Sequence, residues 1–156
     1  MKGHIGHILV PVDFSPGSDA ALAWARDLAE QYEARLSLLH VVTDPRAVGV
    51  LTPEVYVPAV PETRERLLRE ARERLERALP AEEHNRFGLT VDARVGGVME
   101  NILEAAHEQN VDLIVMGTHG RHGLAHLLLG SIAEGVLRNA TCPVLTTHAA
   151  PREQAA

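Results

Sequence analysis

The strongest constraint on the fold is a series of short, almost unbroken apolar runs, because strands of this kind have to be covered on both faces. The segments that intervene carry apolar residues at helical spacing and end in turn-forming residues. These runs are HILVPVD (7–13), RLSLLHVV (35–42), VDLIVMG (111–117) and CPVLTTH (142–148). A fifth strand, LTVDARV (89–95), instead alternates apolar and polar residues, which suits an edge strand with one wetter face. The helical segments lie around 21–32, 62–83, 98–106 and 131–139.

This alternation predicts an α/β fold, a single-domain open five-stranded parallel sheet with helices on both faces, of the Rossmann-like type. We expect one domain over residues 1–148 and a flexible tail over 149–156, since 156 residues suit one core. The proline-rich segment 43–61 is expected to be a long surface loop, and loops of that length often serve a function, for example as a lid. Segment 62–83 is expected to be a solvated edge helix carrying Glu–Arg pairs such as Glu70–Arg74 and Glu73–Arg77.

Charge and composition exclude several classes of function. Fifteen Lys and Arg face 21 Asp and Glu, a net charge of −6, so no basic surplus is available to bind nucleic acid. No run approaches the about 20 apolar residues of a membrane span. The single cysteine, Cys142, excludes an internal disulfide framework. Since the N-terminus has no signal peptide pattern, we expect a cytoplasmic protein.

The glycines that follow the most apolar run point to a bound phosphate. Gly117, Gly120 and Gly130, followed by Ser131, form the pattern G-x2-G-x9-G-S at the end of a buried strand. Glycine lets backbone amides approach an anion closely, and the start of the helix at Ser131 offers free N–H groups and a positive dipole end. Ser131 either binds the phosphate through its hydroxyl or caps the helix. The segment is interpreted as a phosphate cradle.

Three histidines in the same stretch raise the alternative of a metal site. His119, His122 and His126 would have to converge on one ion, yet no carboxylate lies between them and the glycines favour close backbone approach. The phosphate interpretation is therefore preferred. The P-loop pattern is absent, which excludes a P-loop protein, and no G-x-G-x-x-G follows the first strand, which argues against a dinucleotide-binding fold.

Ligands of open α/β sheets bind beyond the carboxyl ends of the strands, where the strand order reverses. The expected site is thus bounded by the loops after Asp13, Val42 and Met116. A carboxylate at the position of Asp13 suits hydrogen bonding to ribose hydroxyls or binding of Mg²⁺. No nucleophile–base arrangement emerges around the serines, so no catalytic residue is assigned.

The chain resembles the universal stress protein (UspA-like) family over nearly its whole length. The residues that carry the resemblance are ILVPVDFSPGSDAALAWARDLA (8–29), LSLLHVV (36–42), ILEAAHEQNVDLIVMGTHGRHGL (102–124) and LLLGSIAEGVLRNATCPVL (127–145). The glycine pattern is similar to that of the family's ATP-binding members. The resemblance implies the strand order 3-2-1-4-5 and a fold like that of the adenine nucleotide alpha hydrolases.

The resemblance also implies an ATP site at the level of single residues, with Mg²⁺ brought by the nucleotide near Asp13. Adenine and ribose would lie against the ends of the first two strands, and the phosphates against the glycine-rich segment. The implied nucleotide-binding residues are Pro11, Val12, Asp13, Val41, Met116, Gly117, His119, Gly120, Arg121, Gly130, Ser131 and Ile132. His126 departs from the family, in which Arg or Lys is common at that position, and Gly135 replaces a bulkier polar residue.

The leading functional hypothesis is an ATP-binding regulatory module of the stress response that acts on an unidentified protein partner. The resemblance implies a homodimer through the last strand, between Pro143 and Thr147. Two alternatives remain open: slow ATP hydrolysis or self-phosphorylation at the same site, and a scaffold that binds no nucleotide.

Overall fold

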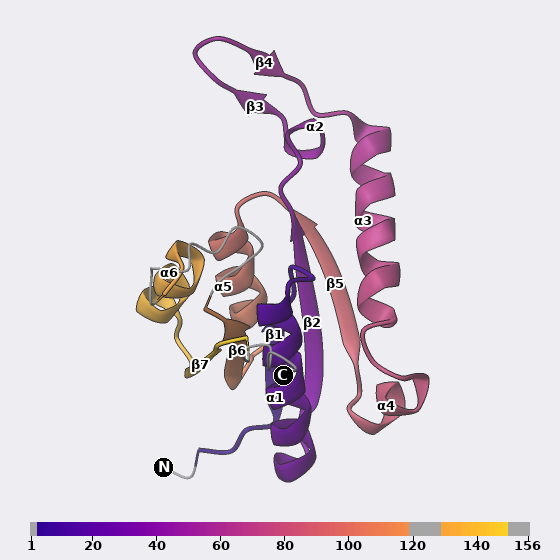
Figure 1. Cartoon of the computed structure of the whole chain (residues 1–156), viewed down its shortest axis with the longest axis vertical. Coiled ribbons are helices and arrows are strands. Elements are labelled where there is room, and N and C mark those ends of the chain that lie inside the picture. The colour runs from indigo at the N-terminus through magenta and orange to yellow at the C-terminus, as the bar shows by residue number, and fades with distance from the viewer. Residues whose placement is uncertain (1–2, 119–128, 150–156) are drawn as a thin grey trace, which may run out of the picture.

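Five parallel strands form the centre of the molecule. In the computed structural model, the residues described are 3–118 and 129–149. The sheet has the order β5-β2-β1-β6-β7, as can be followed in Figure 1. Its strands are β1 (His7–Pro11), β2 (Arg35–Val42), β5 (Thr90–Val95), β6 (Leu113–Gly117) and β7 (Val144–Thr147). Counted along the chain without a separate small hairpin, this is the expected order 3-2-1-4-5, so the predicted α/β fold is confirmed.

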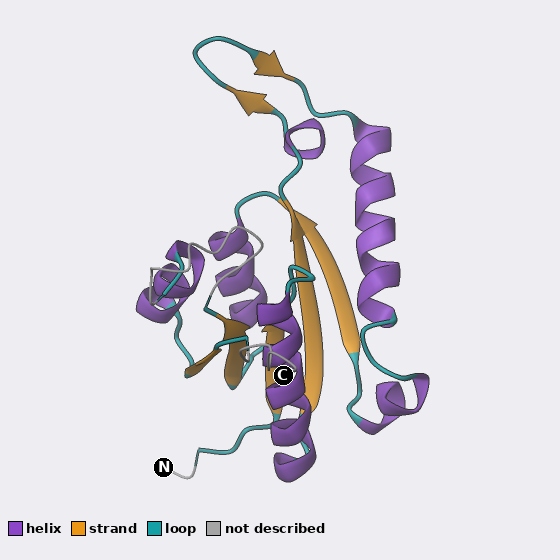
Figure 2. Cartoon of the chain, in the orientation of Figure 1, coloured by secondary structure: helices purple, strands orange, loops and turns teal. Residues whose placement is uncertain are grey.

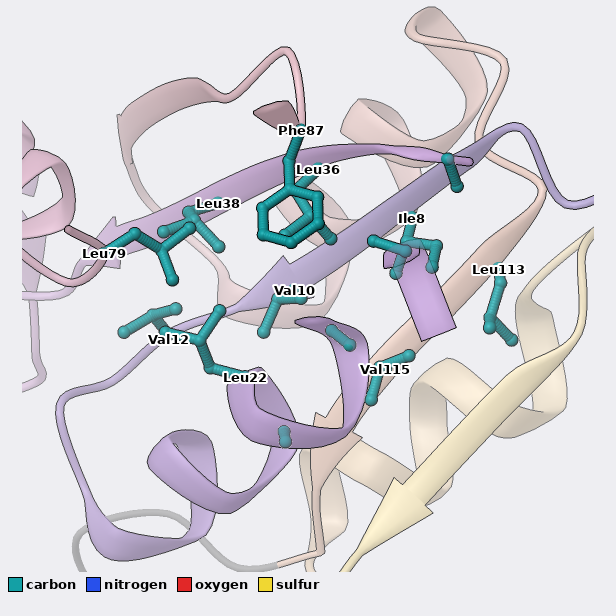
Figure 3. Packing of buried hydrophobic residues seen from close by; sticks show 14 of the residues in the cluster. Ile8, Val10, Val12, Leu22, Leu36, Leu38, Leu79, Phe87, Leu113 and Val115 are labelled. Carbon is teal, nitrogen blue, oxygen red and sulfur yellow. The ribbon is translucent and has the colours of Figure 1, made fainter. Parts of the chain in front are cut away.

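Helices cover both faces of the sheet (Figure 2), and each pair has its own core. On one face, α1 (Pro16–Tyr32) and α3 (Pro61–Glu76) pack on alternate strand residues such as Val10 and Leu38. On the other, α5 (Val98–Glu108) and α6 (Ser131–Asn139) pack on the intervening residues, such as Leu9 and Leu39. Figure 3 shows the first core, in which the Phe87 ring lies beside Leu36. No helix in residues 3–118 or 129–149 is long and apolar enough to cross a bilayer.

The segment 43–61, expected to be a long surface loop, contains short elements of secondary structure. It contains the short helix α2 (Pro45–Val48) and a hairpin of β3 (Val50–Leu51) and β4 (Tyr56–Val57), which projects from the body in Figure 1. The Asp44 side chain caps α2 by accepting from the Arg46 N–H at 2.8 Å. The Thr52 hydroxyl closes the hairpin turn through two hydrogen bonds with the Val55 backbone. Local capping and turn chemistry thus order a segment that its proline content assigned to a loop.

The long charged helix predicted over residues 62–83 is instead two helices. α3 ends at Glu76, and a separate α4 (Ala81–Arg86) begins after Pro80, whose ring cannot continue a helix that precedes it. Among the predicted Glu–Arg pairs, Glu73–Arg77 forms, at 3.0 Å. Glu70 pairs with Arg66 at 3.7 Å rather than with Arg74. The predicted Glu70–Arg74 pair is therefore wrong, and the Arg74 side chain makes a different contact, described below.

Candidate functional site

A cavity of about 910 Å³ lies beyond the carboxyl ends of β1, β2 and β6. This is the place at which the sheet order reverses, because β1 has β2 on one side and β6 on the other. The predicted residues that line it are Pro11, Val12, Asp13, Val41, Met116, Gly117, Gly130, Ser131 and Ile132. The predicted positions His119, Gly120 and Arg121, with His122 and His126, lie outside the described residues.

Asp13 is held in place by the cap of α1. The Ser15 backbone N–H donates to Asp13 Oδ1 at 3.0 Å, and the Ser15 hydroxyl donates to the same oxygen. Ser15 is also the N-cap residue, whose Oγ accepts from the Ser18 N–H at 3.3 Å. One serine therefore fixes both the start of α1 and the orientation of the carboxylate at the cavity.

Gly117 is required by packing on α1. A Cβ at this position would lie 2.8 Å from the carbonyl carbon of Gly17 and 2.9 Å from its oxygen, a distance at which backbone atoms must move. Gly17 is buried in the first turn of α1. The sequence pattern attributed this glycine to close approach of an anion; the structure adds a second cause, which holds with or without a ligand.

The start of α6 offers backbone donors at the cavity wall. Gly130 is the N-cap, and its own N–H donates to the Thr118 carbonyl at 2.7 Å. The N–H groups of Ser131 and Ile132 belong to the first turn, which has no intrahelical acceptor for them. Gly130 itself has no side chain that could cap the helix. The alternative in which the Ser131 hydroxyl caps the helix is therefore wrong, since Gly130 holds that place, and the turn is suited to an anion.

Helix α3 forms a wall of the cavity that the sequence interpretation missed. Leu67, Glu70, Ala71 and Arg74, one face of the helix at spacings of three and four, line it. The guanidinium carbon of Arg74 lies 3.7 Å from the centre of the Phe14 ring. That spacing was the signal that could have identified the wall, but the charged residues around it favoured a solvated face.

His40 completes the wall from β2. Its Nδ1–H donates to the Val12 carbonyl at 2.7 Å, and its ring centre lies 4.8 Å from that of Phe14. Phe14 has a φ of 61°, a left-handed conformation that is uncommon for a bulky residue. The ring of Phe14 thus contacts both the imidazole of His40 and the guanidinium of Arg74.

The charged side chains along the described lining are mostly acidic. Asp13, Asp44 and Glu70 face one cation, Arg74. The side-chain hydrogen bond from Arg46 is the main cause that lowers the pKa of Asp44, so this carboxyl stays ionised. Within residues 3–118 and 129–149, no group of three or more His, Cys, Asp or Glu side chains is placed to hold a metal ion. Among the described lining residues, the groups suited to an anion are the amides of the α6 first turn and the guanidinium of Arg74.

Comparison with known proteins places these features in a family. The model of the universal stress protein family matches residues 4–148. Universal stress protein A homolog 1 of Coxiella burnetii is 35% identical over 148 residues, which cover 91% of this chain and 95% of that protein.

Solved structures agree with the fold. The structure of the protein MJ0577 of Methanocaldococcus jannaschii superposes with a TM-score of 0.73 at 28% identity, over 93% of this chain and 96% of that one. A universal stress protein solved in complex with cAMP gives a TM-score of 0.61 at 25% identity, over 94% and 98% of the two chains. A related protein of the same fold thus binds an adenine nucleotide.

Proposed function

The chain belongs to the universal stress protein family, and from that premise we propose that it is an ATP-binding regulatory module of the stress response. The observation that carries the proposal is the first turn of α6, whose N-cap Gly130 has no side-chain cap and which opens into a cavity at the reversal point of the sheet. Free amides and the helix dipole at that point suit the phosphates. The cAMP complex of a related protein supports an adenine nucleotide as the ligand.

In this proposal the predicted residues divide the ligand between them. Pro11, Val12 and Val41 border the adenine and ribose, and Ser131 and Ile132 bind phosphate through their backbone N–H groups. Asp13 accepts from ribose hydroxyls or holds a Mg²⁺ ion brought by the nucleotide, for which its fixed carboxylate is a suitable ligand. Gly130 contributes shape and the position of α6 rather than a donor, since its N–H is engaged by Thr118.

Regulation is favoured over turnover as the role of the site. Efficient phosphoryl transfer needs cationic groups around the phosphates and a residue that positions the nucleophile. Among the described lining residues, Arg74 is the one Lys or Arg, and it lies on α3, across the cavity from the first turn of α6. Slow hydrolysis at the same site is the second candidate, and the assay below measures it.

The proposed assembly is a cytoplasmic homodimer that pairs β7 with β7 and acts on a protein partner. β7 is the edge of the sheet, and an edge strand presents unpaired backbone groups to a second chain. Its residues between Pro143 and Thr147 include no charged side chain that would oppose pairing.

The test begins with the purified protein. Denaturation followed by mass analysis identifies any nucleotide carried along, and calorimetric titration with ATP, with and without Mg²⁺, measures binding to the emptied protein. We expect the protein to bind ATP, the Asp13→Ala variant to bind it more weakly, and the bound ATP to release little phosphate. No binding at millimolar ATP overturns the proposal, and phosphate release that Asp13→Ala abolishes moves the conclusion to an ATPase.

A further inference from the structure

The cavity extends over both faces of the sheet. Successive residues of a strand point to opposite faces, and Val41 and Val42 both line the cavity. Val41 packs with the core under α5 and α6, whereas Val42 packs with the cluster under α3. The cavity therefore has two halves, which we call the α6 half and the α3 half.

The α6 half has what one nucleotide needs. It combines the amides of the α6 first turn with apolar residues from β2, α5 and β6, such as Val41, Ile102 and Met116. The proposed ATP site occupies this half and the carboxyl-terminal edge of the sheet at Asp13. The α3 half is left unused by that site.

The α3 half carries a cluster of planar groups. The guanidinium carbon of Arg74 lies over the Phe14 ring, 3.7 Å from its centre, and the His40 ring is tilted by 40° to that of Phe14, with 4.8 Å between the ring centres. The Phe14 backbone has a left-handed conformation, which residues with a Cβ rarely adopt, and its ring lies in the α3 half from that position. The hydrogen bond from His40 to the Val12 carbonyl fixes the other end.

Arg74 makes this contact in place of the ion pair that its helix offers. Glu70, four residues earlier, pairs with Arg66, and the Arg74 guanidinium lies over the Phe14 ring at the cavity. Arg74 is also the one Lys or Arg side chain of the described lining, which otherwise holds the carboxylates of Asp13, Asp44 and Glu70. The group is thus both planar and positively charged at a point where an anionic ligand needs a cation.

Nucleobases stack on aromatic rings and on guanidinium planes, and an arginine beside them also attracts the phosphates. We propose that the α3 half is a second nucleobase subsite, formed by Phe14 and Arg74, and that the cavity takes a dinucleoside polyphosphate. One nucleoside binds in the α6 half. The phosphate chain crosses the carboxyl-terminal edge of the sheet, and the second nucleoside binds in the α3 half. This inference rests on the proposed adenine-nucleotide site.

The experiment compares two probes, ATP and diadenosine tetraphosphate, by calorimetry on the full-length protein under one set of conditions. A second stacked base is expected to make diadenosine tetraphosphate bind at least about fivefold more tightly than ATP. Because this ligand has two equivalent ends, a ratio of two or less is explained by statistics alone and overturns the proposal. The ratio in the unchanged protein does not depend on whether any variant folds.

Variants at one helix face then assign the effect. Arg74→Ala and Arg74→Lys are both expected to reduce the ratio to about two, since neither side chain has a plane on which to stack. Arg77→Ala is the matched control: Arg77 pairs with Glu73, is 72% exposed and does not line the cavity, so its ratio stays at the unchanged value. A ratio that Arg74→Lys preserves shows an anion contact and overturns the base subsite.

The two proposals fail in different ways. If neither probe binds, the adenine-nucleotide function is refuted, and the second subsite with it. If ATP binds and diadenosine tetraphosphate has no advantage beyond the factor of two, only the second subsite is refuted.

Discussion

Replacement of Gly117 by alanine tests whether the packing of β6 on α1 sets the geometry of the site. The new methyl group would lie 2.8 Å from the Gly17 carbonyl carbon, so roughly half an ångström of separation is missing from ordinary contact. The obstacle is the backbone of a buried helical turn, not the end of a flexible side chain. Overpacking of this kind costs about 1–3 kcal/mol.

For a chain of this length, that loss corresponds to a fall in the melting temperature of about 2–12 °C. Urea denaturation followed by circular dichroism measures the loss in the free energy of unfolding. We expect a lower urea midpoint with an unchanged dependence of the free energy on urea concentration. Because the shift displaces the start of α1, and Ser15 there orients Asp13, we also expect weaker ATP binding in the same variant.

Gly135→Ala is the matched control. Its methyl group would meet the end of the Met99 side chain, which can move aside, and alanine is favoured over glycine in a helix by about 1 kcal/mol. Its stability should therefore stay within about 1 kcal/mol of the parent. The argument is refuted if Gly117→Ala unfolds at the same urea concentration as the parent protein.

Three further changes test the core, the α1 cap and the buried histidine. Leu75 is fully buried in the core under α3, so Leu75→Ala should lower the free energy of unfolding by about 2–5 kcal/mol. Leu51 on the hairpin is 80% exposed, so Leu51→Ala should change stability by less than about 0.5 kcal/mol. Equal losses of the two variants in urea titrations contradict this assignment. Ser15→Ala should cost about 1 kcal/mol and weaken ATP binding through Asp13, and binding that survives unchanged shows that the carboxylate needs no such support. Burial lowers the pKa of His7, so the unfolded chain takes up the proton more readily and stability falls as the pH drops below the ordinary value of 6.5. Urea midpoints between pH 7.5 and 5.5 should therefore fall further in the parent than in His7→Gln, and equal falls contradict the assignment.

The sheet could be predicted from the sequence because buried parallel strands have a direct pattern. The unbroken apolar runs of β1, β2 and β6 have no other common explanation, and the reversal of strand order then places a site at their carboxyl ends. Nine of the twelve predicted nucleotide-binding residues line the cavity found there. The remaining three lie outside the described part of the chain.

What escaped prediction depends on contacts between distant segments. Nothing in the local pattern indicates that Arg74 lies over Phe14, sixty residues earlier, instead of pairing with Glu70. The hydrogen bond from Gly130 to Thr118, which removes one expected phosphate donor, likewise joins residues that only the folded chain brings together. The break before α4 is different, since Pro80 is visible in the sequence and a proline ends a helix that precedes it.

The central position of β1 also orders events during synthesis. β1 pairs in register with β2, for example Ile8 with Leu36, and on its other side with β6, where Ile8 meets Leu113. The first partner leaves the ribosome soon after β1, but more than 100 residues separate β1 from the second. Throughout that interval an apolar strand edge stands open, which invites pairing with other chains. Production of this chain should therefore depend on holding a three-stranded half-sheet in solution until its last third arrives.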